Sequence, residues 1–362
     1  MKKLKNILRQ LHLILGLGSG LVVFIVSVTG CIYAFEEQIR SVIYKNTFYH
    51  VCNHEHKSLI ELTDVLRRNY PDQKLKNIII PEEKNANVLF VLKNRIIVYV
   101  NPETAEVSGT LNRETEFFEI VLKIHRSLLL GDTGKIITGT SALIFFFMIV
   151  SGIILWWPKN KRNLSKKIKL RLDSGKKRRN YDLHSVLGFY ASWILIFSVI
   201  TGLVFSFKWF EGAMYTLVGS KKEEKNYKSE YLNQKTANAG MIVSDLQLEY
   251  PLAEFTIVMP GDSMSAYRVT VTEKGGFLKK QHHFYFDQYT GKPIGQKLFA
   301  EQNLGEKLRT TNYNIHTGKV LGLSGQFIIF FAGLVAASLP VTGFLIWYRR
   351  NFGKLKGVDE NA

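Results

Sequence analysis

Four histidines stand at equivalent places in two matching pairs of segments. His12 and His184 each begin the pattern Leu-His-x3-Gly-x12-Thr-Gly. His125 and His316 each precede spaced glycines, a long apolar run and a tryptophan, in HRSLLLGDTGKIITGTSALIFFFMIVSGIILWW and HTGKVLGLSGQFIIFFAGLVAASLPVTGFLIWY. Imidazole is the commonest metal ligand among side chains, so this duplicated set predicts a metal-dependent function.

The arrangement predicts bis-histidine haem ligation. Two histidines at matching depth on neighbouring membrane helices can supply both axial ligands of a b-type haem. Small residues at i+4 from a histidine lie on the same helical face and leave room for a flat group beside the imidazole. Zinc at the same histidines is the alternative, and it is less natural because a structural zinc site needs four converging ligands. We therefore predict two haem b groups, with no catalytic residue beyond their ligands, held by His12 with His184 and His125 with His316, and flanked by Gly16, Gly188, Gly131 and Gly322.

Four apolar stretches must position these histidines. Residues 11–35, 136–157, 183–207 and 321–348 contain almost no charge, and each is long enough to cross a hydrocarbon core of about 30 Å as a helix. The first could instead be a cleaved signal peptide. Its apolar region exceeds that of a signal peptide, and its His12 has a partner in the third stretch, so we predict four permanent transmembrane helices.

Positive charge predicts the orientation of these helices. Residues 159–180 hold eleven Lys and Arg against a single Asp173, and both termini are also basic. The positive-inside rule then makes both termini and this linker cytoplasmic. The net charge of +18 is interpreted as a topology signal with contact to membrane lipid, and no nucleic-acid partner is expected.

The two extracytoplasmic loops show the same weaker pattern. In the first, residues 58–70 predict a short amphipathic helix, and residues 77–80, 88–92 and 95–100 predict strands. In the second, a helix ends at Tyr250, and strands are predicted near residues 254–259, 266–272 and 282–287. Each loop therefore predicts one small module of a helix and an antiparallel sheet.

These units resemble the PepSY-associated transmembrane helix family of bacterial inner-membrane proteins. The resemblance is carried by the tandem His-bearing helices, the Tyr-Pro helix ends and the strand ends VYVNPET and FYFDQYT, although Ala105 replaces the glycine that Gly291 supplies in the second module. It implies an α-helical polytopic membrane protein with four transmembrane helices in two tandem repeats and two small α+β PepSY-like modules in the periplasm.

The resemblance extends to inner-membrane ferric-siderophore reductases. It implies passage of electrons across the membrane to a ferric siderophore or other Fe(III) chelate, which releases iron on reduction. No stretch predicts a nicotinamide or flavin domain, so the electron donor would be quinol or a separate cytoplasmic reductase. Two alternatives remain open: a non-enzymatic membrane-tethered regulator that binds a peptide or protease, and an iron-chelate permease component.

The predicted boundaries follow from these elements. They are 5–36 for the first transmembrane helix, 37–116 for the first module, 117–158 for an outer helix with the second transmembrane helix, 159–180 for the basic cytoplasmic linker, 181–209 for the third transmembrane helix, 210–312 for the second module, 313–349 for the fourth transmembrane helix and 350–362 for a cytoplasmic tail. The stretch from His125 to Trp156 is too long for one membrane crossing, so its helix either projects outward or breaks at 131–134.

Two further histidine groups lie in the modules. His50, Cys52, His54 and His56 resemble a short metal-binding tract, but the flanking sequence favours a mobile, solvated loop. Cys52 and Cys31 together form neither a disulfide framework nor a thiolate metal site. His282 and His283 fall at a strand start, where an ordinary strand role is expected.

Overall fold

The computed structural model describes residues 2–158, 160, 162, 164–171, 173–223, 227–232 and 236–352. Most of the predicted tail, 353–362, and Lys159, Lys161, Asn163 and Leu172 of the predicted linker lie outside the described residues. The chain forms two compact units. The helical unit contains Met1–Phe35, Ile120–Met214 and Asn312–Ala362, and the sheet unit contains Glu36–Glu119 and Tyr215–Thr311.

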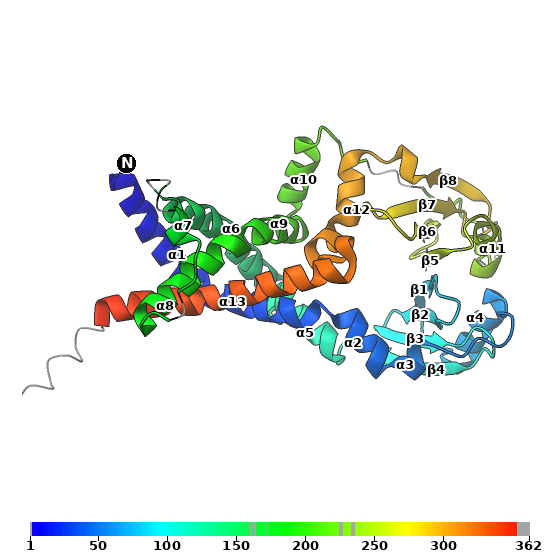
Figure 1. The fold of residues 1–362 in the computed structure, drawn as a ribbon. Coiled ribbons are helices and arrows are strands. Elements are labelled where there is room, and N and C mark those ends of the chain that lie inside the picture. The colour runs from blue at the N-terminus through cyan, green and yellow to red at the C-terminus, as the bar shows by residue number, and fades with distance from the viewer. Residues whose placement is uncertain are drawn as a thin grey trace, which may run out of the picture. The chain divides into compact units, whose positions relative to one another are not determined.

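Four helices dominate the helical unit (Figure 1). They are α1 (Lys2–Tyr33), α6 (Gly131–Trp156), α9 (Gly188–Ser206) and α13 (Gly322–Phe352), and α9 continues α8 (Lys176–Asp182) through a π-helical turn at Leu183–Leu187. Together with the helical turns that adjoin them, all four helices are long and apolar enough to cross a membrane. Their internal hydroxyls bond to carbonyls of the preceding turn, as Thr29 does to Ile25, so these polar groups remain satisfied in lipid.

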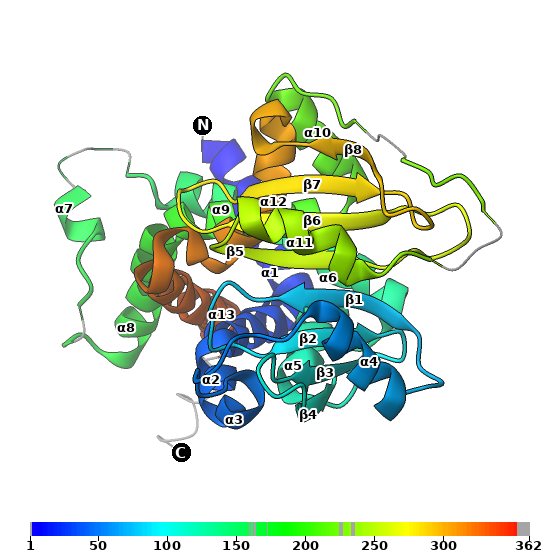
Figure 2. The same cartoon turned by 90° about the vertical axis from the view of Figure 1, so that its right-hand side faces the viewer.

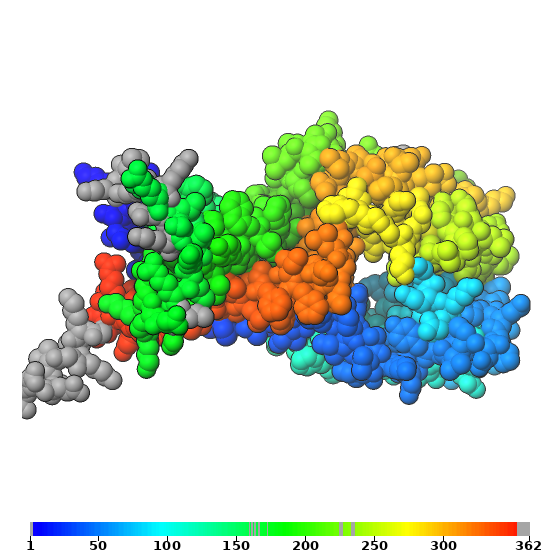
Figure 3. All heavy atoms as spheres, in the orientation of Figure 1, coloured from blue at the N-terminus to red at the C-terminus, as the bar shows by residue number. Residues whose placement is uncertain are grey.

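The four helices form a closed ring of neighbours. Both α1 and α9 pack against α6 and α13. Val23, Phe145, Leu195 and Ala336 contribute one side chain from each helix to a shared apolar core. Side chains of α9 and α13 meet over one face of this unit in Figure 3. This packing gives each of the four helices two neighbours within the ring.

Short helices precede α6 and α13. They are α5 (Phe117–Ser127) and α12 (Leu304–Thr317), and each ends before a tight turn that starts the next helix at Gly131 or Gly322. Of the two possibilities predicted for the stretch from His125 to Trp156, the structure therefore shows a break before α6 and not one helix that projects outward. A Cβ on Gly134 would overlap the carbonyl oxygen of Ser127, and one on Gly325 would overlap that of Gly318, so only glycine permits this close return of the chain.

The sheet unit contains one antiparallel sheet of eight strands, seen face-on in Figure 2. Its order is β4-β3-β2-β1-β5-β6-β7-β8. The strands are β1 (Leu75–Ile80), β2 (Val88–Leu92), β3 (Ile96–Val100), β4 (Val107–Asn112), β5 (Ala253–Val258), β6 (Tyr267–Glu273), β7 (Lys280–Phe286) and β8 (Pro293–Lys297). The helices α4 (Leu59–Asn69) and α11 (Ala239–Glu249) add Leu62 and Val243 to the core beneath the sheet.

The expectation of two separate modules is wrong in one respect. Strand β1 pairs with β5, with Ile78 opposite Ile257, so the two segments predicted as separate modules share one sheet. The physical reason is that an isolated module would expose an apolar edge strand, which the pairing covers. Six strands and both helices were predicted to within a few residues, but β4 and β8 were missed. The remaining described α-helices are α2 (Glu36–Ile43), α3 (Lys45–Phe48), α7 (Leu164–Lys167) and α10 (Lys208–Leu217), and short 3₁₀ helices lie at Phe299–Glu301 and Lys319–Leu321.

Candidate functional site

The first pair of histidines joins α1 to the π-helical turn before α9. The ring centroids of His12 and His184 lie 6.5 Å apart, with an angle of 88° between the ring planes. The π-helical turn Leu183–Leu187 widens the helix at His184, a distortion that is frequent at functional sites. The structure therefore brings together the two histidines that the sequence pattern paired.

Hydroxyl groups hold the Nδ1 atoms of this pair. His12 Nδ1 lies 2.7 Å from Ser151 Oγ on α6, and His184 Nδ1 lies 3.0 Å from Thr342 Oγ1 on α13. A partner at Nδ1 fixes the ring orientation and leaves Nε2 as the remaining ring nitrogen, which is the usual arrangement around a metal-bound histidine.

The second pair repeats this arrangement at the ends of α5 and α12. The ring centroids of His125 and His316 lie 6.2 Å apart, with 64° between the planes. His125 Nδ1 is 2.9 Å from the carbonyl oxygen of Val26 and 3.3 Å from Thr29 Oγ1. His316 Nδ1 is 3.0 Å from both the Ser198 carbonyl oxygen and Thr201 Oγ1. Each Nδ1 thus has two acceptors, one of them on the backbone.

A glycine lies against the Cε1 atom of every one of these rings. A Cβ on that glycine would be between 3.1 and 3.5 Å from Cε1. In each case this glycine directly follows the hydroxyl residue that faces Nδ1. Each imidazole therefore packs against one Ser/Thr-Gly dipeptide. These are Ser151-Gly152 for His12, Thr342-Gly343 for His184, Thr29-Gly30 for His125 and Thr201-Gly202 for His316. These dipeptides occur at matching places in the sequence repeats, but the sequence alone does not show that they contact the imidazoles.

The predicted flanking glycines have other surroundings. A Cβ on Gly16 would meet Met148, and one on Gly188 would meet Leu339, so both positions permit close helix packing. Gly131 and Gly322 have φ of +57° and +61°, and the turns before α6 and α13 account for glycine at both positions. The residues that contact the histidine rings are therefore the Ser/Thr-Gly dipeptides and not these four predicted glycines.

The spacing within each pair would suit a metal ion, such as a haem iron, held between the two imidazoles. Metal–nitrogen bonds of about 2.0 Å on both sides, with the radius of each ring added, would place the centroids of two ligating imidazoles about 6.3 Å apart. The observed 6.5 and 6.2 Å agree with that separation. A single zinc ion does not fit all four rings, because Thr29 follows His12 by 17 residues (29 − 12) on α1, a rise of about 26 Å.

A cationic hollow lies next to the first pair. It measures about 420 Å³ and includes Lys177, Arg178 and Arg349 in its lining. Asn180, also in the lining, donates to the Thr342 carbonyl oxygen at 3.0 Å. Since Thr342 also faces His184, this hollow adjoins the pair and would favour an anionic group beside it.

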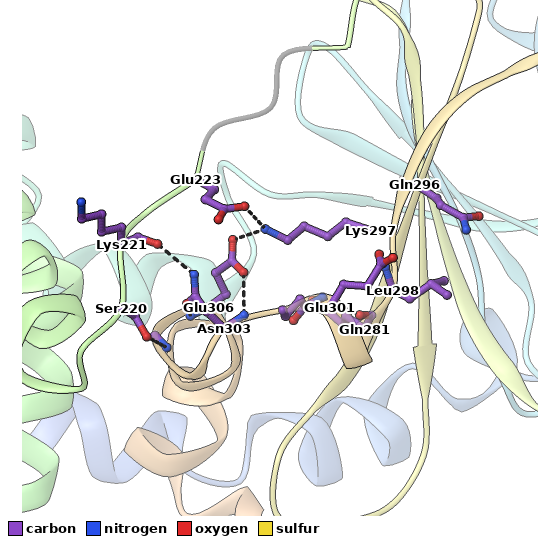
Figure 4. A network of polar contacts seen from close by, with 12 residues as sticks. Ser220, Lys221, Glu223, Gln281, Gln296, Lys297, Leu298, Glu301, Asn303 and Glu306 are labelled. Carbon is purple, nitrogen blue, oxygen red and sulfur yellow. Dashed lines mark hydrogen bonds and ion pairs between the residues drawn. The ribbon is translucent and has the colours of Figure 1, made fainter.

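The sheet unit has a second hollow, of about 300 Å³. Tyr227 and Tyr285 stack there with centroids 4.3 Å apart. Lys297 bridges Glu306 at 2.6 Å and Glu223 at 3.2 Å (Figure 4). Burial would lower the pKa of Lys297, but these two carboxylates outweigh it and raise the pKa above its ordinary value. Burial lowers the pKa of His283 in the same lining, and Arg268 reinforces that effect.

The helices and the sheet define the class of the protein. Four candidate membrane-spanning helices with histidine pairs near both ends of the bundle, together with a separate antiparallel sheet, are features of a polytopic membrane protein. Over residues 9–350 the sequence matches the PepSY-associated TM region, and the chain belongs to this family. The predicted resemblance to the PepSY-associated transmembrane family is thereby confirmed. Among curated proteins the comparison finds no match to this chain.

Proposed function

We propose that this protein is a haem b-containing inner-membrane reductase that passes electrons across the membrane to an extracytoplasmic Fe(III) chelate, such as a ferric siderophore. The observation that most directly supports this proposal is the duplicated histidine site. The ring centroids of the two imidazoles are 6.5 Å apart in one pair and 6.2 Å apart in the other. Haem bound at both levels would supply one-electron chemistry near each membrane face.

The residues of this chain would hold and tune that chemistry. Ser151, Thr342 and the carbonyls of Val26 and Ser198 accept the Nδ1 protons, which leaves each Nε2 free as a ligand. The apolar core of the helical unit lies between the two levels and would give the bound haems surroundings of low polarity. No proton transfer by a side chain is required, because reduction of each Fe(III) consumes one electron and breaks no bond in the chelate.

The proposed orientation places the first pair on the cytoplasmic side and the sheet unit in the periplasm. The basic segment 159–180 and the basic termini support this arrangement. The order of a helix, four strands, a short helix and a long helix occurs in both halves of the chain, which supports two tandem repeats. Quinol or a cytoplasmic reductase would deliver electrons beside the cationic hollow.

The hollow of the sheet unit is the proposed seat for the chelate. Stacked Tyr227 and Tyr285 offer aromatic surface there, and Arg309 lines the same hollow, whereas the charge of Lys297 is balanced by Glu223 and Glu306. An iron chelate with planar aromatic groups would stack on these rings. Fe(II) binds hard oxygen ligands more weakly than Fe(III), so one electron would release the metal.

Absorption spectroscopy of the purified full-length protein tests this function. We expect a dithionite-reducible b-type spectrum that loses about half its amplitude in His12→Ala and in His316→Ala, each of which removes an axial ligand of one site. His54→Ala, outside both pairs, is the matched control. Ferric chelates should then reoxidise the dithionite-reduced protein in a single turnover. Colourless protein would overturn the proposal and favour the peptide-binding regulator, and reduced haem that no ferric chelate oxidises would remove the chelate as acceptor.

A further inference from the structure

A second cluster of metal-ligating groups lies in the sheet unit, apart from the four histidines of the helical unit. His50 follows α3, Cys52 is two residues further on, and Glu103 lies in the turn after β3. One ligand atom from each of the three residues falls within 4.8 Å of the other two. The chain thus gathers nitrogen, sulfur and oxygen donors from positions about 50 residues apart in sequence (103 − 52 = 51).

His50 is fixed with one nitrogen directed at the cluster. Its side chain is only 4% exposed. Its Nδ1 lies 3.1 Å from Asn87 Oδ1, and the amide nitrogen of the fully buried Asn87 donates to the Thr47 carbonyl oxygen at 2.8 Å. This chain of hydrogen bonds keeps the Nδ1 proton in place and leaves Nε2 as the free ligand.

Glu103 is held from the opposite side of the cluster. Its side chain is also 4% exposed, and the backbone N–H of Asn53 donates to its two carboxylate oxygens at 3.0 and 3.1 Å. Its own N–H donates to Asn101 Oδ1 at 2.8 Å. Cys52 is exposed, so the cluster is accessible from solvent on the sulfur side.

The separations between these atoms are close to those between two ligands of one shared ion. His50 Nε2 is 3.6 Å from Glu103 Oε1, beyond the usual hydrogen-bond length of about 2.7–3.2 Å. It is 3.8 Å from Cys52 Sγ. Two ligands of a tetrahedral zinc ion, at bond lengths of about 2.0–2.3 Å, are separated by about 3.3–3.6 Å. The two observed distances lie at or slightly above this separation, so a bound ion would draw the ligands slightly inward.

We propose that His50, Cys52 and Glu103 form a binding site for one Zn²⁺ ion. Mixed nitrogen, thiolate and carboxylate donors suit zinc, whereas magnesium and calcium prefer oxygen alone and Cu⁺ prefers soft sulfur. The fourth position falls to water or to His56, whose ring centroid is 5.8 Å from that of His50. A bound ion would tie residues 50–56 to the turn after β3, so the expected solvated loop becomes an ordered part of the sheet unit.

Cobalt substitution tests the site in the full-length protein after chelator treatment. We expect one equivalent of Co²⁺ to produce a thiolate-to-metal charge-transfer band in the near ultraviolet, and Zn²⁺ to displace it. Cys52→Ser should abolish the band, and Glu103→Gln should weaken Zn²⁺ binding about 10-fold or more in competition with a chromophoric chelator. Because Cys52 is exposed, its replacement by serine leaves the packed core intact.

The other cysteine supplies the matched control. Cys31→Ser changes a thiol buried on α1, and it should leave the cobalt band and zinc affinity unchanged. A band that persists in Cys52→Ser, or wild-type zinc affinity equal to that of the Cys52→Ser variant, would overturn the proposal. Haem absorption, measured on the same samples, should be identical in Cys52→Ser and wild type, which separates this site from the histidine pairs.

Discussion

Replacing Ser151 with alanine probes how the helical unit positions its imidazoles. Nδ1 of His12 is hydrogen-bonded to Ser151 Oγ at 2.7 Å, whereas Nδ1 of His125 is 2.9 Å from the Val26 carbonyl oxygen and 3.3 Å from Thr29 Oγ1. Loss of the serine hydroxyl leaves a buried N–H without this acceptor. Outer-shell losses of this kind reduce metal affinity about 10–100-fold, or roughly 1.4–2.7 kcal/mol. Thr29→Val retains the carbonyl acceptor, so we expect a change of less than about threefold.

Haem transfer to excess apomyoglobin measures both effects. Wild-type protein reconstituted with two haems should release them in slow phases, and Ser151→Ala should accelerate one phase about 10–100-fold while leaving the other unchanged. Ser151→Thr, which restores a hydroxyl, should return the rate toward that of wild type. Equal release from Ser151→Ala and wild type would rule out positioning by this hydroxyl, and equal acceleration in Thr29→Val would remove the distinction between the two levels.

Two further substitutions give graded outcomes. A Cβ at Gly30 would lie 3.1 Å from His125 Cε1, whereas a Cβ at Gly152 would lie at an ordinary 3.5 Å from His12 Cε1. Gly30→Ala should therefore shift the absorption spectrum and the reduction potential of the haem. Gly152→Ala should leave both properties nearly unchanged. Comparable shifts in the two variants would contradict this steric difference. The lowered pKa of His283 means that the unfolded state binds more protons, so the stability of the sheet unit should fall as pH drops below about 6.5. Thermal unfolding between pH 7 and 5 should show this loss in wild type and a smaller one in His283→Gln, and parallel profiles would exclude His283 as the source.

Much of the helical unit was predictable because strong, local signals determine it. Uncharged apolar runs of membrane length leave helices as the main option, and the positions of His12 and His184 within equivalent helices predict that they meet. The break before α6 followed from a length mismatch, since the stretch from His125 to Trp156 exceeds one membrane crossing.

The missed features depend on contacts between distant residues. Strand β4 (Val107–Asn112) and strand β8 (Pro293–Lys297) contain Gly, Ser, Pro and Lys, which carry little strand propensity, and they form because β3 and β7 present open edges. The pairing of β1 with β5 and the approach of Glu103 to His50 likewise require the folded sheet. No spacing rule in the sequence specifies them.

The residues that contact the four imidazoles show how each half of the chain contributes to the two histidine pairs. His12 and His125 are both oriented by residues of the first half, Ser151 and Val26 respectively. His184 and His316 are oriented in the same way within the second half. Each half therefore sets one imidazole at each level by itself, and the halves meet across the two ring pairs. A group that needs one imidazole from each half would therefore bind only when both halves are assembled.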